Sequence, residues 1–167
     1  MPEQDDNGRL LVLGIGNFLC GDDGIGPVLA ERLVSLYDDH PHVEVLNGGT
    51  IGLGLIYLFE CHDSLLFLDA VDADAEPGTV FKFTLEDLEI ARSEKKLSSH
   101  QSDPYELMLY ARTIGCLPKN VAVLGVQIDT IRPGIGLSEA LLHKLERIEK
   151  NIVEEINGYL KTCMSCP

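Results

Sequence analysis

The stretch LVLGIGNFLCGDDGIGPVLAERL, from Leu11 to Leu33, decides the fold of this protein. An apolar run ends in a Gly-Ile-Gly motif and a helical pattern begins at Ile25, as a strand leads into a helix in a nucleotide-binding fold. Two adjacent aspartates, Asp22 and Asp23, occupy the turn where a phosphate would sit. Because carboxylates repel a phosphate, this turn favours a cation.

The length and composition predict one domain. The chain has 167 residues, of which 45% are apolar, which suits a single core. We expect one domain over residues 1–167, with frayed tails at 1–8 and 162–167. The acidic start, the lack of a run of ~20 apolar residues and the odd number of cysteines predict a cytoplasmic protein with reduced thiols.

The charge balance points away from two classes of partner. The chain has 13 basic and 27 acidic residues, a formal net charge of −14. Such a charge repels nucleic acid and anionic membranes, and it favours a cation or a basic polypeptide segment. We therefore expect no nucleic-acid or membrane partner.

Five apolar runs rich in β-branched residues, each ending in turn residues, predict five strands. They are Arg9–Leu13, Val43–Leu46, Ser64–Leu68, Thr79–Phe83 and Val121–Val126. Helical patterns lie between most of them, which predicts a largely parallel, doubly wound α/β sheet. The gap between the third and fourth runs is too short for a helix, which leaves room for one antiparallel strand.

The helical patterns differ in how clearly they begin and end. The pattern that starts at Ile25 follows the first strand, and a second is predicted from Ile51 to Phe59 after Thr50. Asp103 as N-cap, Pro104 and Gly115 bracket a third, Tyr105–Ile114, and a fourth runs from Ser138 to about Lys161. The polar stretch LEDLEIARSEKKLSSH, residues 85–100, is expected to be mobile.

Candidate metal ligands gather at one edge of this sheet. Asp22 and Asp23 follow the first strand, Asp69 follows the third, and His100 ends the polar stretch. Ligands bind beyond the carboxyl ends of strands in such sheets, and two carboxylates with an imidazole suit a divalent transition metal. The simpler alternatives are a helix N-cap for Asp22, bonds to loop amides for Asp69 and a solvated His100. The other four histidines lie in turns or on a helix with no partner that the sequence suggests.

A dinucleotide site fits the same residues poorly. Its fingerprint requires a third glycine three residues after the second, whereas Gly21 comes two residues late. The second predicted strand ends in Asn47, where an acidic residue would bind the ribose. Asp22 and Asp23 would also place negative charge against a pyrophosphate.

Four motifs carry a resemblance to a known family. GIGNFLCGDDGIGP, NGGT, LFLDAVDADAEPGTV and SSHQ, in this order and spacing, resemble the hydrogenase maturation proteases. The resemblance covers nearly the whole chain. It implies a single-domain, three-layer α/β fold with a twisted, mostly parallel five-stranded sheet between helices. It also implies an endopeptidase that removes the C-terminal extension of a nickel-iron hydrogenase large subunit.

The resemblance further implies a site and a partner. Asp23, Asp69 and His100 match the family's metal-recognition and catalytic residues. No metal is permanently bound, because the nickel is supplied by the substrate, and zinc or cadmium can substitute for it in vitro. The partner is then the nickel-loaded large-subunit precursor, and the protease is expected to be a monomer.

Two departures from the family pattern affect the site. The first-loop ligand is glutamate in some members, and Asp23 is one methylene shorter. Where the family usually has D-G-G-T, this chain has Asn47 before Gly48 and Gly49, and an amide cannot act as a general base. We expect the two glycines to shape the turn into the second helix and to contribute to substrate binding.

Several mechanisms and functions remain open from the sequence. The metal can mark the site of cleavage, polarise the carbonyl or activate a water, while one carboxylate of the site takes a proton. The chain has no H-E-x-x-H or G-x-S-x-G motif, which disfavours zincin and serine chemistry and leaves an aspartic-type water attack open. The alternative functions are a non-cleaving nickel-handling or checkpoint protein and a nucleotide-dependent enzyme on a similar sheet.

Overall fold

A five-stranded sheet forms the centre of the computed structural model, which describes residues 8–50, 52–93 and 103–163. The strand order is β2-β1-β3-β5-β4. β1 pairs in parallel with β2 and β3, β3 pairs in parallel with β5, and β4 is antiparallel to β5. The strands are β1 (Leu10–Ile15), β2 (Val43–Gly49), β3 (Ser64–Val71), β4 (Val80–Thr84) and β5 (Asn120–Gln127).

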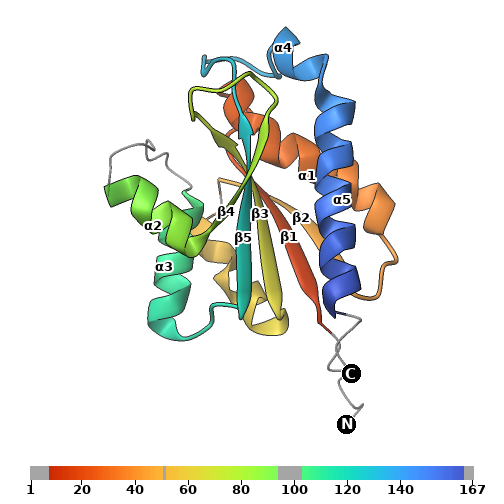
Figure 1. Ribbon diagram of the computed structural model, residues 1–167, viewed down its shortest axis with the longest axis vertical. Helices are drawn as coiled ribbons and strands as arrows, with labels where there is room; N and C mark the ends of the chain where they lie inside the picture. The colour runs from red at the N-terminus through yellow and green to blue at the C-terminus, as the bar shows by residue number, and fades with distance from the viewer. Residues whose placement is uncertain (1–7, 51, 94–102, 164–167) are drawn as a thin grey trace.

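Helices cover both faces of the sheet (Figure 1). One face packs against α1, α4 and α5, and the other packs against η2, α2 and α3. A short 3₁₀ turn, η1, leads from β1 into α1. The bounds are η1 (Asp22–Gly24), α1 (Ile25–Tyr37), η2 (Gly52–Cys61), α2 (Leu85–Ser93), α3 (Pro104–Ile114), α4 (Glu139–Leu142) and α5 (Leu145–Cys163).

The alternation of side chains along the strands produces two apolar layers. In β1, Leu10 and Val12 face α1 and α5, whereas Leu11 and Leu13 face η2 and α3. Every residue of β1 is buried, as expected for a central parallel strand that is covered on both faces. The fold predicted from the sequence, a mostly parallel five-stranded α/β sheet between helices, is confirmed.

The predicted strands and the third helix are confirmed, and the strand that follows the short gap, β4, is the antiparallel one. Asp103 caps α3 by accepting a hydrogen bond from the Tyr105 backbone N–H, and Gly115 ends the helix with a φ of 82°. Asp103, Pro104 and Gly115 therefore have the roles that their order in the sequence indicates.

Two other helical predictions require correction, and a helix that the sequence did not predict lies in the polar stretch. The segment after Thr50 is a 3₁₀ helix, consistent with glycines at 52 and 54 that disfavour a regular α-helix. The long helix predicted from Ser138 is interrupted between α4 and α5, where Lys144 binds Glu76 and the Pro77 carbonyl of the β3–β4 loop. The polar stretch expected to be mobile contains α2 over residues 85–93, whereas residues 94–100 lie outside the described ranges.

In the part of the chain that the structure describes, no helix combines the length and the apolar character that crossing a membrane requires. The expected tail residues 1–7 and 164–167 lie outside the described ranges, and α5 continues to Cys163.

Candidate functional site

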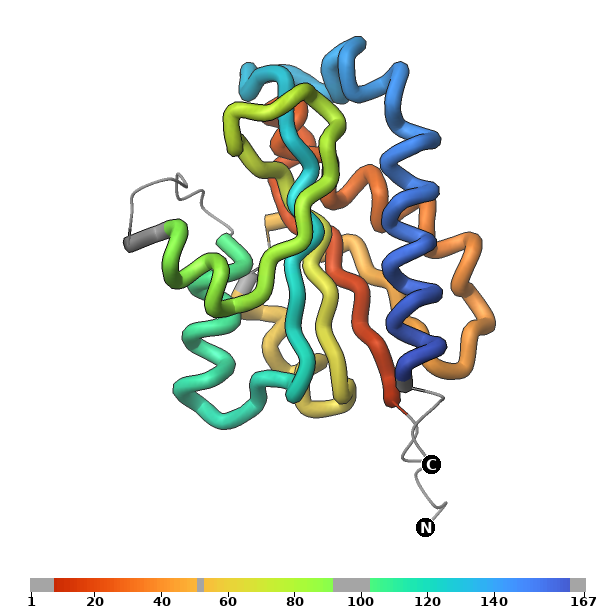
Figure 2. The backbone as a smooth tube through the Cα atoms, viewed as in Figure 1, coloured from red at the N-terminus to blue at the C-terminus, as the bar shows by residue number. Residues whose placement is uncertain are grey.

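The candidate site lies where the strand order reverses. After β1 the chain passes to β2 on one side, and after β2 it crosses to β3 on the other side of β1. The carboxyl ends of β1 and β3 therefore flank the crevice in which open α/β sheets bind ligands. Figure 2 shows the loop after β5 and the turn before β4 at the same end of the molecule as the start of α1.

Glycines bring α1 unusually close to this crevice. A Cβ atom at Gly26 would lie 2.3 Å from the carbonyl oxygens of both Ile15 and Leu68, and one at Gly14 would lie 2.3 Å from the carbonyl oxygen of Gly26. Only hydrogen atoms fit in these spaces, so the first turn of α1 rests directly on the ends of β1 and β3. Leu68 immediately precedes Asp69, and this close contact therefore holds η1 beside that carboxylate.

Asp23 and Asp69 lie near each other in the crevice. Asp23 is on η1 and accepts a hydrogen bond of 2.9 Å from the backbone N–H of Asn17. Asp69 is on β3 and accepts one of 2.8 Å from the backbone N–H of Ala70. Burial raises the pKa of Asp69 well above its usual value; the hydrogen bond from Ala70 opposes this shift, and the charge of Asp23 adds to it. Such a carboxylate pair favours a proton or a cation between its members.

The third residue predicted for the site, His100, lies outside the described residues. Within the described ranges, no group of three or more histidine, cysteine, aspartate or glutamate side chains is arranged to hold a metal ion. The charge of Asp23 acts on Asp69, and the assignment of Asp23, Asp69 and His100 as metal ligands stays a prediction.

Asp22 has a different role from the helix cap considered for it. Its side chain is 0% exposed and makes no capping bond to η1 or α1. Its carboxylate accepts hydrogen bonds from the backbone N–H groups of Asp129, Thr130 and Ser138, at 2.9, 3.1 and 2.7 Å, and from the Ser138 hydroxyl at 2.9 Å. Asp22 therefore fastens the loop after β5 to η1, which positions its neighbour Asp23.

The Asn-Gly-Gly segment forms the end of β2. The Asn47 Oδ1 atom accepts a hydrogen bond from the Gly49 N–H at 3.0 Å, and Asn47 Nδ2 donates one of 2.8 Å to Glu31 on α1. A Cβ atom at Gly48 would lie 2.9 Å from the Leu55 side chain, and Gly49 has a φ of 49°, which favours glycine. Both glycines have structural reasons to be there, and their contact with substrate stays a prediction.

Gln127 was not singled out from the sequence, yet it organises the loop that follows Asp69. Its side chain is buried at the end of β5, where Oε1 accepts hydrogen bonds from the N–H groups of Ala73 and Ala75, and Nε2 donates to Asp72. The signal for this role is a polar residue that directly ends an otherwise apolar strand, in NVAVLGVQ.

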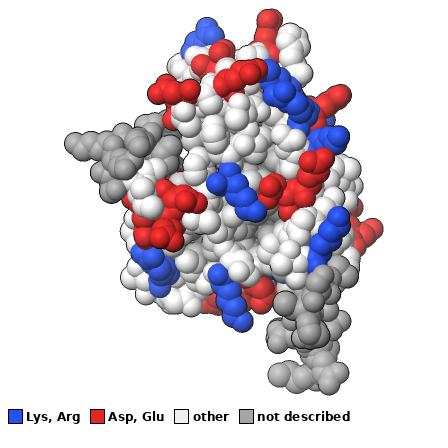
Figure 3. Space-filling model, viewed as in Figure 1, with Lys and Arg blue, Asp and Glu red and all other residues white. Residues whose placement is uncertain are grey.

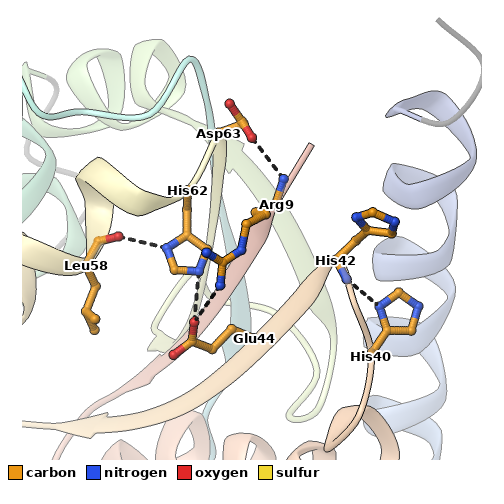
Figure 4. A network of polar contacts seen from close by, with 7 residues as sticks. All are labelled: Arg9, His40, His42, Glu44, Leu58, His62 and Asp63. Atoms are coloured by element: carbon orange, nitrogen blue, oxygen red, sulfur yellow. Dashed lines mark hydrogen bonds and ion pairs between the residues drawn. The ribbon is translucent and has the colours of Figure 1, made fainter. Parts of the chain in front are cut away.

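Three of the remaining histidines lie at the opposite end of the sheet, near the starts of β2 and β3 (Figure 4). Contrary to the expectation that they lack partners, His62 is 6% exposed and bonds the Leu58 carbonyl through Nδ1 and Glu44 through Nε2, at 2.7 and 3.1 Å. His40 accepts a bond from the backbone N–H of His42. Their position excludes these three histidines from the crevice of Asp23 and Asp69.

Comparison with known proteins shows the family to which this chain belongs. The family model described as "HycI: Hydrogenase maturation protease" matches residues 27–155. The chain belongs to the hydrogenase maturation protease family. The "Hydrogenase 2 maturation protease" of Escherichia coli K12 is 34% identical to it over 140 residues, which cover 83% of this chain and 84% of that protein.

Solved structures of this family share the fold. The hydrogenase maturating endopeptidase HybD from E. coli superposes with a TM-score of 0.72 and 29% identity, over 90% of this chain and 93% of that chain. The HupD proteins of Bradyrhizobium diazoefficiens and Rhizobium leguminosarum are 35% and 38% identical over 76% and 71% of this chain. These two relatives are longer, and the matches span 66% and 59% of their lengths.

Proposed function

We propose that this protein is an endopeptidase that removes the C-terminal extension of a nickel-iron hydrogenase large-subunit precursor after nickel insertion. The observation that carries the proposal is the Asp23 and Asp69 pair at the switch point of a hydrogenase maturation protease fold. His100 completes the set of ligands. The nickel is part of the substrate and is presented together with the extension.

The electrostatics of the pair support recognition of a metal. Burial and the nearby charge of Asp23 disfavour an ionised Asp69 in the free protein. A divalent cation bound between the two carboxylates offsets this repulsion and favours the ionised form of Asp69. A nickel-free precursor offers no such compensation, so the pair favours binding of the loaded form.

The chemistry required is a single peptide hydrolysis. A water oxygen bonds to the carbonyl carbon of the scissile peptide as a site carboxylate takes its proton. The carbon–nitrogen bond then breaks, and the leaving nitrogen receives a proton. When the metal centre is bound by Asp23 and Asp69, the C-terminal extension is held near these carboxylates. The attack of water on the scissile bond then becomes effectively intramolecular.

Incubation of the protein with nickel-loaded and nickel-free precursor, followed by mass spectrometry of the large subunit, tests this function. We expect loss of the C-terminal peptide from the loaded precursor alone. Binding without a change of mass would instead indicate a checkpoint protein, and equal cleavage of both precursors would rule out metal recognition.

A further inference from the structure

A cavity of about 300 Å³ opens beside the turn that carries Asp23. Gly24, which follows Asp23 in the chain, lines it together with residues of α1, the end of β2 and the loop before α4. This volume is at the lower end of the range for ligand pockets, which suits one amino-acid side chain. The cavity is therefore a candidate subsite for a residue of the precursor near the bond that is cut.

The walls of the cavity are apolar and joined to each other. Phe18 and Ile135 line it and are 53% and 80% exposed, while Val28 and Leu137 contribute further apolar surface. The loops that bear Phe18 and Ile135 are linked by backbone bonds from Gly21 N–H to the Gly134 carbonyl and from Gly134 N–H to the Leu19 carbonyl, at 3.0 and 2.8 Å. The cavity is thus formed before any substrate binds.

Gly24 sets the position of the Phe18 wall. A Cβ atom at Gly24 would lie 2.6 Å from Phe18 Cα, so only glycine allows the loop to pack this closely on η1. The same loop contains Asn17, whose backbone N–H binds the Asp23 carboxylate. The cavity wall and the proposed metal ligand are therefore connected through one turn.

One acidic side chain gives the cavity its chemical character. Glu31 lines it, and among the described residues that share this lining there is no lysine, arginine or histidine. Glu31 receives a hydrogen bond of 2.8 Å from the neutral amide of Asn47, which orients the carboxylate without neutralising it. Asn47 is in turn fixed by its bond from Gly49 N–H. An aspartate at position 47 would face Glu31 with a second negative charge.

We propose that this cavity binds a lysine or arginine side chain of the hydrogenase precursor close to the scissile bond; this inference rests on the proposed function. Such a side chain has an apolar stem that matches Phe18, Val28 and Ile135, and a cationic end that matches Glu31. The net charge of −14 favours a basic segment of the partner as well. Glu31 then contributes to substrate specificity without taking part in the bond cleavage.

The affinity of nickel-loaded precursor for the Glu31→Gln variant tests this inference independently of cleavage. Glutamine keeps the volume of the side chain and an acceptor for Asn47, and it removes only the charge. Because Glu31 is exposed to solvent, we expect the Kd to rise about threefold when this ion pair is lost. Glu60→Gln, at an exposed carboxylate of η2 outside the lining, is the matched control and should leave the Kd unchanged.

A set of precursors with each lysine or arginine near the cleavage site changed to methionine completes the experiment. One precursor variant should bind the wild-type protease more weakly by the same factor as Glu31→Gln weakens binding of the unchanged precursor. The same precursor variant should bind Glu31→Gln no more weakly than the unchanged precursor does, which identifies the partner residue. The inference would be overturned if Glu31→Gln bound the precursor as tightly as the wild type does. It would also be overturned if, for every precursor variant, the effects of the protease change and the precursor change on the Kd were independent of each other. Tight binding by the wild type without cleavage would contradict the proposed function. The affinities of the variants would still test the proposed binding pocket, because they do not depend on cleavage.

Discussion

At the residue scale, three neighbouring features of the first loop have distinct physical roles. The buried carboxylate of Asp22 accepts four hydrogen bonds, the carboxylate of Asp23 accepts one from the Asn17 backbone N–H, and the glycines around them permit close backbone contact. The two aspartates are adjacent in the sequence, but only their burial and partners separate the structural residue from the proposed ligand.

Asp69→Asn should make the metal-free protein more stable at neutral pH. Because the folded-state pKa of Asp69 is raised, its contribution to stability is intact below the unfolded value near 3.9 and is lost as the pH rises through the folded value. Asparagine carries no charge and keeps an acceptor for the Ala70 N–H. We expect a higher Tm for Asp69→Asn than for the wild type at pH 8, and a smaller difference at pH 4.

Thermal unfolding of the two proteins at both pH values measures this effect. A lower Tm for Asp69→Asn at pH 8 would contradict a carboxylate that is held in an unfavourable, desolvated environment.

Asp22→Ala should be strongly destabilising, because it removes a fully buried carboxylate that accepts four hydrogen bonds from the loop after β5 and from Ser138. We expect a loss of about 3 kcal/mol or more in the free energy of unfolding, measured by urea denaturation. Asp103→Ala removes a true helix cap and should cost only about 1 kcal/mol. Equal losses in the two variants would show that Asp22 acts as no more than a cap.

At the element scale, the sequence predicts what depends on local patterns. β-branched runs located all five strands, and a cap, a proline and a glycine located α3. The missed helix α2 has a local signal as well: the Thr84 and Asp87 side chains each accept a hydrogen bond from the other residue's backbone N–H, as in a capping box. At the break between α4 and α5, Lys144 contacts a loop that is far away in the sequence, so no local pattern indicated this contact.

For the candidate site, too, the sequence indicated what depends on position in the chain and missed what depends on contacts between distant loops. Strand ends place Asp23 and Asp69 at one edge of the sheet, which their positions in the chain already indicate. The burial of Asp22 and the pairing of Asn47 with Glu31 arise from loops that are distant in sequence, so residue type and spacing could not reveal them.

Gly26→Ala tests the close contact that positions α1. The added Cβ would lie 2.3 Å from two carbonyl oxygens, which cannot move away as a flexible side chain would. We expect a loss of about 3 kcal/mol in the free energy of unfolding. At Gly158 in α5 an added Cβ meets nothing within 4 Å, and Gly158→Ala should stabilise the protein by about 0.5–1 kcal/mol. A harmless Gly26→Ala would mean that α1 can move away from β1 and β3 without cost.

At the scale of the whole molecule, charge and fold act together. Acidic and basic side chains are interspersed on the face shown in Figure 3, and some are paired, as Lys82 is with Glu155 at 2.7 Å. Such exposed pairs contribute little to stability. The excess of acidic residues instead favours a cationic ligand, which agrees with a crevice built around Asp23 and Asp69 and with the cavity at Glu31.

The most direct test of the account is the rate at which single variants of the three proposed ligands process nickel-loaded precursor, followed by the mass of the large subunit. We expect Asp23→Asn, Asp69→Asn and His100→Gln each to lower this rate about 100-fold or more, since each removes a proposed metal ligand, while Glu60→Gln should match the wild type. Wild-type rates for the first three variants would contradict recognition of the metal by these residues.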